Sequence, residues 1–305
     1  MEIYEALALK DIADAADLLR PVYDGANGAD GFVSIEVNPE LARDTQGTIA
    51  EARRLSKALD RRNVLIKVPA TPEGIPAIRT LIGEGISVNV TLIFSLDAYR
   101  AVANAYIDGL NDYARSGRTD VARIASVASF FVSRVDTLAD RLLDAVRGPG
   151  AAEAAELKGK IAIANARLAY REFTELFDGQ RFASLARLGA RPQRTLWAST
   201  STKNPSYPDT LYLDGLMGPK TVNTLPPATL EAFLDHGKVA DAIDVDVEGA
   251  RKRVAKLKEF GISYDAVTAE LLEGGVKAFA DSFRSLLANI EKKRSGLLAA
   301  PATGR

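Results

Sequence analysis

The sequence contains no cysteine and only one histidine, His236. The first absence excludes disulfides, thiolate catalysis and thiolate metal sites, and the second excludes metal centres built on two or three imidazoles. No apolar run approaches the roughly 18 residues that suggest a membrane-spanning helix. The first residues include several acids and show no basic stretch followed by an apolar run, so they do not resemble a signal peptide. We therefore expect a soluble, cytoplasmic protein that does not bind membranes.

Charge of one sign is also lacking, because 39 Lys and Arg residues face 40 Asp and Glu residues for a net charge of -1. Such a balance does not attract nucleic acid. The 305 residues are enough for one large α/β domain or two ordinary ones. Since no Pro/Gly/Ser-rich linker divides the chain, we expect one domain over 1–305. It would have a helical lead-in at 1–30, C-terminal helices at 240–293 and a tail at 294–305.

Short β-branched runs alternate with longer amphipathic segments, which is the rhythm of strand–helix units around a parallel sheet. Either a (β/α)8 barrel or an open doubly wound sheet fits this pattern. No G-x-G-x-x-G follows any strand and no G-x-x-x-x-G-K-[ST] occurs, so the barrel is favoured. The expected strands are Gly31–Val37, Asn63–Val68, Ser87–Ile93, Ala125–Val132, Thr195–Ser199 and Thr221–Thr224.

Lys67 is the only charge inside the apolar strand at 63–68. Apolar surroundings favour the neutral form of an amine, and a neutral amine is a nucleophile that forms a Schiff base with a carbonyl. The alternative is a lysine on an edge strand, where it blocks aggregation. The pattern alone leaves both interpretations open.

Two further strands carry isolated polar groups. Glu36 is the one ionisable residue of its strand, and it either shuttles protons or forms a structural ion pair with a lysine or arginine. Ser87, Asn89 and Thr91 alternate with valines. They are either hydrogen-bonding groups for a polyhydroxylated ligand in a barrel lumen or the solvent face of an edge strand.

Cationic groups follow the two later strands. Ser129 is expected to point inward, and Arg134 stands at the end of the same strand. Ser199 and Lys203 follow the next strand in a loop rich in hydroxyls. Arginine offers a planar fork of donors to phosphate, and loop N–H groups with a cation can share one anion. Two such clusters on late strands favour a phosphate site.

Taken together, these segments resemble the transaldolase family. The resemblance follows family order over nearly the whole chain, and it is closest to the long bacterial type, some of whose members are fused to a glucose-6-phosphate isomerase domain. It rests on Val64–Thr71, Gly85–Phe94, Ser126–Asp136 and Ala198–Pro205.

The resemblance implies a (β/α)8 barrel without cofactor or metal. Such an enzyme moves a dihydroxyacetone unit from sedoheptulose 7-phosphate or fructose 6-phosphate to glyceraldehyde 3-phosphate or erythrose 4-phosphate, in the pentose phosphate pathway. By position, Lys67 matches the Schiff-base lysine, Glu36 the acid/base that works through a water, and Thr91 the hydroxyl that holds that water. The substrate-binding positions matched are Asn89, Ser129, Arg134, Ser199 and Lys203.

The chain departs from the family at its start, where the first two barrel strands are not found. Residues 1–30 instead resemble helices and a loop, and the strand at 31–37 would be the third of the barrel. Two unpaired edges would then remain, which a closed barrel abolishes. We expect that Met1 is an internal methionine of a longer protein; the alternative is a truncated form that is unstable and inactive.

Two other functions remain open from the sequence. One is a Schiff-base aldolase of the fructose-6-phosphate type, and the other is a sugar-phosphate-binding remnant without turnover. A zinc-dependent aldolase is disfavoured by the single histidine. Exterior helices of such a barrel allow a homodimer, although no interface is evident from the sequence.

Overall fold

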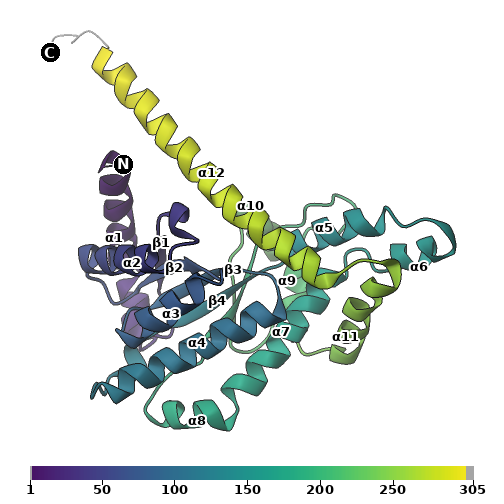
Figure 1. Cartoon of the computed structure of the whole chain (residues 1–305), viewed down its shortest axis with the longest axis horizontal. Coiled ribbons are helices and arrows are strands. Elements are labelled where there is room, and N and C mark those ends of the chain that lie inside the picture. The colour runs from purple at the N-terminus through teal and green to yellow at the C-terminus, as the bar shows by residue number, and fades with distance from the viewer. Residues whose placement is uncertain (1, 300–305) are drawn as a thin grey trace.

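The computed structural model describes residues 2–299 and has a six-stranded parallel sheet with helices between the strands (Figure 1). All six expected strands are confirmed, most of them trimmed at their ends. Neighbouring strands are parallel throughout. The strands are β1 (Val33–Glu36), β2 (Val64–Pro69), β3 (Val88–Ile93), β4 (Ser126–Phe131), β5 (Arg194–Ala198) and β6 (Thr221–Asn223).

The strands lie side by side in chain order, from β1 to β6. A doubly wound sheet reverses its order at a switch point, whereas a barrel keeps one direction. The barrel-type α/β interpretation is therefore confirmed. In the part of the chain that the structure describes, the sheet is open, because β1 pairs only with β2 and β6 only with β5.

Helices follow most of the strands, and they pack on the sheet and on one another. The N-terminal helix agrees with the expected helical lead-in. The α-helices are α1 (Glu2–Gly25), α2 (Thr45–Leu59), α3 (Gly74–Gly83), α4 (Leu96–Arg115), α5 (Ser133–Leu143), α6 (Ala151–Glu156), α7 (Ile161–Phe177), α8 (Gln180–Arg187), α9 (Leu211–Leu216), α10 (Pro227–His236), α11 (Val247–Lys256) and α12 (Tyr264–Ala299). Short 3-10 turns occupy Pro39–Leu41, Val121–Arg123, Gly148–Gly150 and Leu257–Phe260.

The core lies on both faces of the sheet. Every residue of β3 and β4 is buried, as expected for parallel strands that are covered on both sides. A contact across the sheet shows that it is curved. Arg194 at the start of β5 donates to the carbonyl of Ala29, in the loop before β1, at 2.9 Å, although three strands lie between β1 and β5. This curvature gives the sheet one concave face, on which side chains of distant strands can meet.

The long helix α12 crosses the molecule and extends beyond the body (Figure 1). Its Phe283 packs edge-on against Tyr4 of α1, with ring centroids 5.2 Å apart. The helix continues to Ala299, so the expectation of a tail from residue 294 is wrong for 294–299. Leucine and alanine are good helix formers, and Gly296 alone does not end the helix. Residues 300–305 lie outside the described part.

Asp136 of α5 is a carboxyl buried in the core, with 1% of its surface exposed. Burial is the largest effect on this group, and it raises the pKa of Asp136 from 3.8 to about 7. Between these two pH values the folded chain binds more protons at this carboxyl than the unfolded chain does. Its contribution to the free energy of unfolding therefore falls as pH rises through this window, by roughly 4 kcal/mol at most.

We expect Asp136→Asn to remove this pH dependence. Urea unfolding of both proteins at several pH values between 4 and 7.5 measures it, since the other titrating groups cancel in the difference. The variant should gain stability relative to the parent chain as pH rises. A difference that stays constant over the whole range would contradict the raised pKa.

Candidate functional site

Three neighbouring strands place a row of polar side chains on the concave face of the sheet. Glu36, Lys67 and Asn89 are register partners on β1, β2 and β3. The ammonium Nζ of Lys67 lies 3.7 Å from Oε2 of Glu36. The structural alternative for Glu36, an ion pair, is thus present, and it is made with the other candidate catalytic residue. β2 and β3 each have a strand on both sides, so the edge-strand interpretations of Lys67 and of 87–91 are wrong.

Asn89 is held by hydrogen bonds on both ends of its amide. Its Nδ2 donates to Oγ of Ser34 at 3.2 Å. Its Oδ1 accepts from Oγ of Ser129 at 2.7 Å. The amide has a second N–H that these contacts leave free. The structure therefore brings Asn89 and Ser129 together, next to the Lys67–Glu36 pair.

Thr91 follows Asn89 on the same face of β3 and is 1% exposed. Thr91 lies within a shift in the pairing of β3 with β4, which falls between Val90 and Ile93. Leu92 in this irregularity has φ +59°, a left-handed conformation that costs a non-glycine residue free energy. Strain of this kind persists where the surroundings impose it, and it concentrates at functional sites. The local geometry is consistent with a functional position for Thr91.

The electrostatics of the pair favour proton exchange. Burial raises the pKa of Glu36, and the nearby charge of Lys67 lowers it by less, so that the pKa stays above its ordinary value. A carboxyl with a raised pKa can both give and take a proton nearer neutral pH. Glu36 is thus placed to receive a proton that an attacking amine releases.

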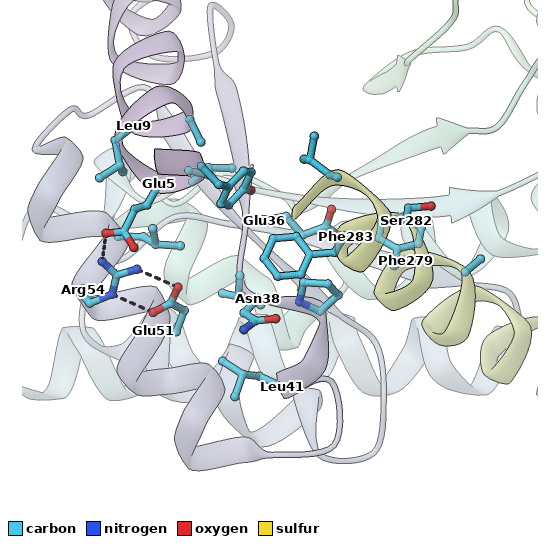
Figure 2. A pocket seen from close by; sticks show the side chains of 18 of the residues that line it. Glu5, Leu9, Glu36, Asn38, Leu41, Glu51, Arg54, Phe279, Ser282 and Phe283 are labelled. Carbon is cyan, nitrogen blue, oxygen red and sulfur yellow. Dashed lines mark hydrogen bonds and ion pairs between the residues drawn. The ribbon is translucent and has the colours of Figure 1, made fainter. Parts of the chain in front are cut away.

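A cavity of about 800 Å³ opens beside this pair. It is lined by α1, β1, α2 and α12, and Glu36 stands in its wall (Figure 2). Phe279 of α12 lines the same cavity, and its ring centroid lies 5.7 Å from Nζ of Lys67. The size lies in the usual range for small-molecule sites. The ring of Phe279 therefore brings α12 next to the candidate nucleophile, whose side chain remains 27% exposed.

Two arginines line this cavity, and they differ in their partners. Arg54 is neutralised by Glu51 and Glu5 (Figure 2). Arg134, in the first turn of α5, lies against the ring of Phe131, 5.1 Å from its centroid, and it has no carboxylate partner among the described residues. Burial lowers the pKa of Arg134, which nevertheless remains a cation. An unneutralised, half-buried guanidinium at a cavity suits an anionic ligand.

Ser199 lies near Arg134, but no contact brings Lys203 there. Ser199 directly follows β5 with φ +56°, and its Oγ lies 2.9 Å from Oγ of Ser133, the residue before Arg134. Lys203 is exposed and donates to Oγ of Ser201 at 2.5 Å. It does not line the cavity. A phosphate role for Lys203 therefore stays a prediction.

Sequence reasoning did not find Phe279. It lies more than two hundred residues after Lys67, on an amphipathic helix where a phenylalanine looks like any other core residue. No local pattern marks it. Over residues 2–299, no group of three or more potential metal ligands occurs and no helix is long and apolar enough to cross a membrane.

Comparison with known proteins finds relatives that match nearly the whole chain. A family model described as "Transaldolase/Fructose-6-phosphate aldolase" matches residues 1–290. The chain is 46% identical to the "Transaldolase" of Trichodesmium erythraeum over 96% of its own length and 79% of that protein. It is 53% identical to the "Transaldolase" of an Arthrobacter species over 92% and 75%. It is 49% identical to "Transaldolase 2" of Streptomyces coelicolor over 99% and 80%.

Proposed function

Because the chain belongs to the transaldolase/fructose-6-phosphate aldolase family, we propose that it is a transaldolase of the pentose phosphate pathway. It moves a dihydroxyacetone unit from sedoheptulose 7-phosphate or fructose 6-phosphate to erythrose 4-phosphate or glyceraldehyde 3-phosphate. The observation that carries the proposal is the pair of Lys67 and Glu36, 3.7 Å apart, of which Glu36 lines the cavity.

The proposed reaction starts when the ammonium group of Lys67 passes a proton to Glu36 and the resulting neutral amine attacks the ketose carbonyl. Glu36 returns this proton to the carbinolamine oxygen, which leaves as water, so that the iminium forms and Glu36 is ionised again. The resulting iminium accepts the electron pair of the C3–C4 bond as that bond breaks, and an enamine forms. The proton of the C4 hydroxyl passes to Glu36 through a water that Thr91 positions, and the first aldose leaves. The enamine carbon then attacks the carbonyl of a second aldehyde, and Glu36 returns the proton to the oxygen of that carbonyl. Hydrolysis of the iminium releases the new ketose and the lysine.

The remaining candidates bind the substrate. Asn89 and Ser129, already bonded to each other, contact the hydroxyls of the dihydroxyacetone unit. Arg134 binds the phosphate, with Ser199 and Lys203 contributing from the loop after β5. The ring of Phe279 covers part of Lys67 and reduces the access of water to the enamine.

Arg134→Gln tests the phosphate assignment. We expect KM for fructose 6-phosphate to rise by about 10- to 100-fold, because a charge-assisted contact contributes about 1.5–3 kcal/mol. KM for unphosphorylated fructose should hardly change. Arg54→Gln is the matched control, because that guanidinium lines the same cavity but is already neutralised. Equal losses on fructose and fructose 6-phosphate would argue against a phosphate role.

Product analysis tests the reaction itself. Fructose 6-phosphate and erythrose 4-phosphate should give glyceraldehyde 3-phosphate and sedoheptulose 7-phosphate in equal amounts. Release of free dihydroxyacetone instead would support the aldolase alternative, and no product would support a binding remnant. A homodimer and a cytoplasmic location stay predictions, which size-exclusion chromatography and cell fractionation can check.

A further inference from the structure

Two buried carboxylates of α5 take no part in the proposed chemistry. Asp136 and Asp140 are 1% and 8% exposed, and they lie one helical turn apart. The helix that carries them also carries Arg134 in its first turn. Burying two acids on one helix is costly unless both are well bonded, so their partners indicate what they hold.

Each carboxylate accepts one tyrosine hydroxyl. Oδ2 of Asp136 accepts from Tyr212 of α9 at 3.0 Å. Oδ2 of Asp140 accepts from Tyr207, in the loop between β5 and α9, at 2.7 Å. Both tyrosines therefore fasten the chain that follows β5 to the helix of Arg134.

The other oxygen of each carboxylate binds the backbone around the start of α7. Oδ1 of Asp136 accepts from the Ala162 N–H at 2.7 Å. Oδ1 of Asp140 accepts from the Gly159 N–H at 3.0 Å. These bonds restrict the rotation of each carboxylate, so that Oδ2 stays directed at its tyrosine hydroxyl.

Tyr207 is also held by shape. A Cβ at Gly159 would lie 2.8 Å from Cζ of the Tyr207 ring, and Gly159 has φ +69°. Only glycine allows the ring to approach this closely. The loop that carries Ser199 and Lys203 is thus seated against α5 at Tyr207. It is joined to α5 a second time where Ser199 meets Ser133.

We propose that Asp136 and Asp140 are positioning residues that hold the loop after β5, through Tyr212 and Tyr207, at the distance from Arg134 that a phosphate requires. This inference rests on the proposed function, since it assumes that Arg134 binds the substrate phosphate. A binding site loses affinity when its donors shift by about 1 Å. The two carboxylate–tyrosine bonds, together with the contact of Ser199 to Ser133, limit such a shift.

Tyr207→Phe tests the role with the loss of one hydroxyl, and Tyr170→Phe is the matched control. Tyr170 lies on α7, and its hydroxyl donates a comparable hydrogen bond to the Pro219 carbonyl at 3.0 Å. We expect Tyr207→Phe to raise KM for fructose 6-phosphate about tenfold, to leave kcat and KM for fructose nearly unchanged, and to add little to the effect of Arg134→Gln. Asp140→Asn keeps one acceptor oxygen, so it should raise KM for fructose 6-phosphate less than Asp140→Ala does.

Calorimetric binding of inorganic phosphate separates this proposal from the function on which it rests. If Arg134→Gln weakens phosphate binding and Tyr207→Phe does so as well, both stand. If Arg134→Gln weakens it while Tyr207→Phe behaves like Tyr170→Phe, the positioning role is wrong and the phosphate site stands. If Arg134→Gln binds phosphate as the parent chain does, the phosphate site itself is wrong, and the inference falls with it.

Discussion

Replacing Lys67 by arginine is expected to lower kcat/KM for transfer on the order of 10⁴-fold or more, because loss of a covalent nucleophile removes the whole pathway rather than one contact. Arginine keeps the positive charge beside Glu36, 3.7 Å away in the parent chain. It cannot form a Schiff base, since its guanidinium stays protonated. The expected result therefore isolates the amine chemistry from the electrostatic support of Glu36.

A coupled assay of glyceraldehyde 3-phosphate formation measures the loss, and thermal unfolding checks that the fold persists. Lys67→Met is the companion variant, because methionine keeps the apolar stem but leaves Glu36 without its cation. Both variants should be equally inactive, although Lys67→Met should raise the pKa of Glu36 further, since Lys67 lowers it in the parent chain. Activity above about one tenth of the parent rate in either variant would rule out Lys67 as the nucleophile.

Glu36→Gln is expected to lower kcat by about 10²- to 10⁴-fold, the usual contribution of a positioned acid or base. KM should change little, because Glu36 is assigned to proton transfer and not to substrate binding. The parent kcat should fall as pH drops through the pKa of Glu36, since only the ionised carboxylate accepts the C4 proton. Burial raises that pKa above 4.5, so the acidic limb should have its midpoint above this value.

The kcat profile of Glu36→Gln should lack this acidic limb. Glu51→Gln is the matched control, because Glu51 lines the same cavity and is paired with Arg54. It should leave both kcat and the limb in place. A limb that is unchanged in Glu36→Gln would assign the titration to another group and remove Glu36 from the proton transfer.

The alternation of side chains along each strand made most of the site predictable. Because the side-chain period of a strand is two, a single polar residue in an apolar strand is assigned to one face. This sufficed to select Glu36, Lys67 and Asn89. Their alignment on one level, however, depends on the register between strands, which no single strand sequence encodes. The order of the strands in the sheet is not encoded in a single strand either, and the edge-strand interpretations were wrong because β2 and β3 each have a strand on both sides.

Contacts between distant segments were not predictable from local patterns. The approach of Phe279 to Lys67 depends on how α12 returns across the sheet. The bond of Asp136 to Tyr212 joins residues 76 positions apart, and that of Asp140 to Tyr207 joins residues 67 positions apart. Such pairs are selected by packing of the whole chain, and propensity and periodicity do not report them. The end of α12 was placed too early, because the tail was expected from residue 294 and the helix continues to Ala299.

Borohydride reduction in the presence of fructose 6-phosphate tests the central claim most directly. Reduction of the iminium attaches the sugar carbon permanently to the lysine nitrogen. Trypsin does not cleave after the modified residue, so the account predicts a new peptide covering 63–79 in place of separate peptides ending at Lys67 and Arg79. Its added mass should be that of the reduced dihydroxyacetone unit or of the whole ketose. An adduct on another lysine, or intact cleavage after Lys67 in a chain that turns over substrate, would contradict the account.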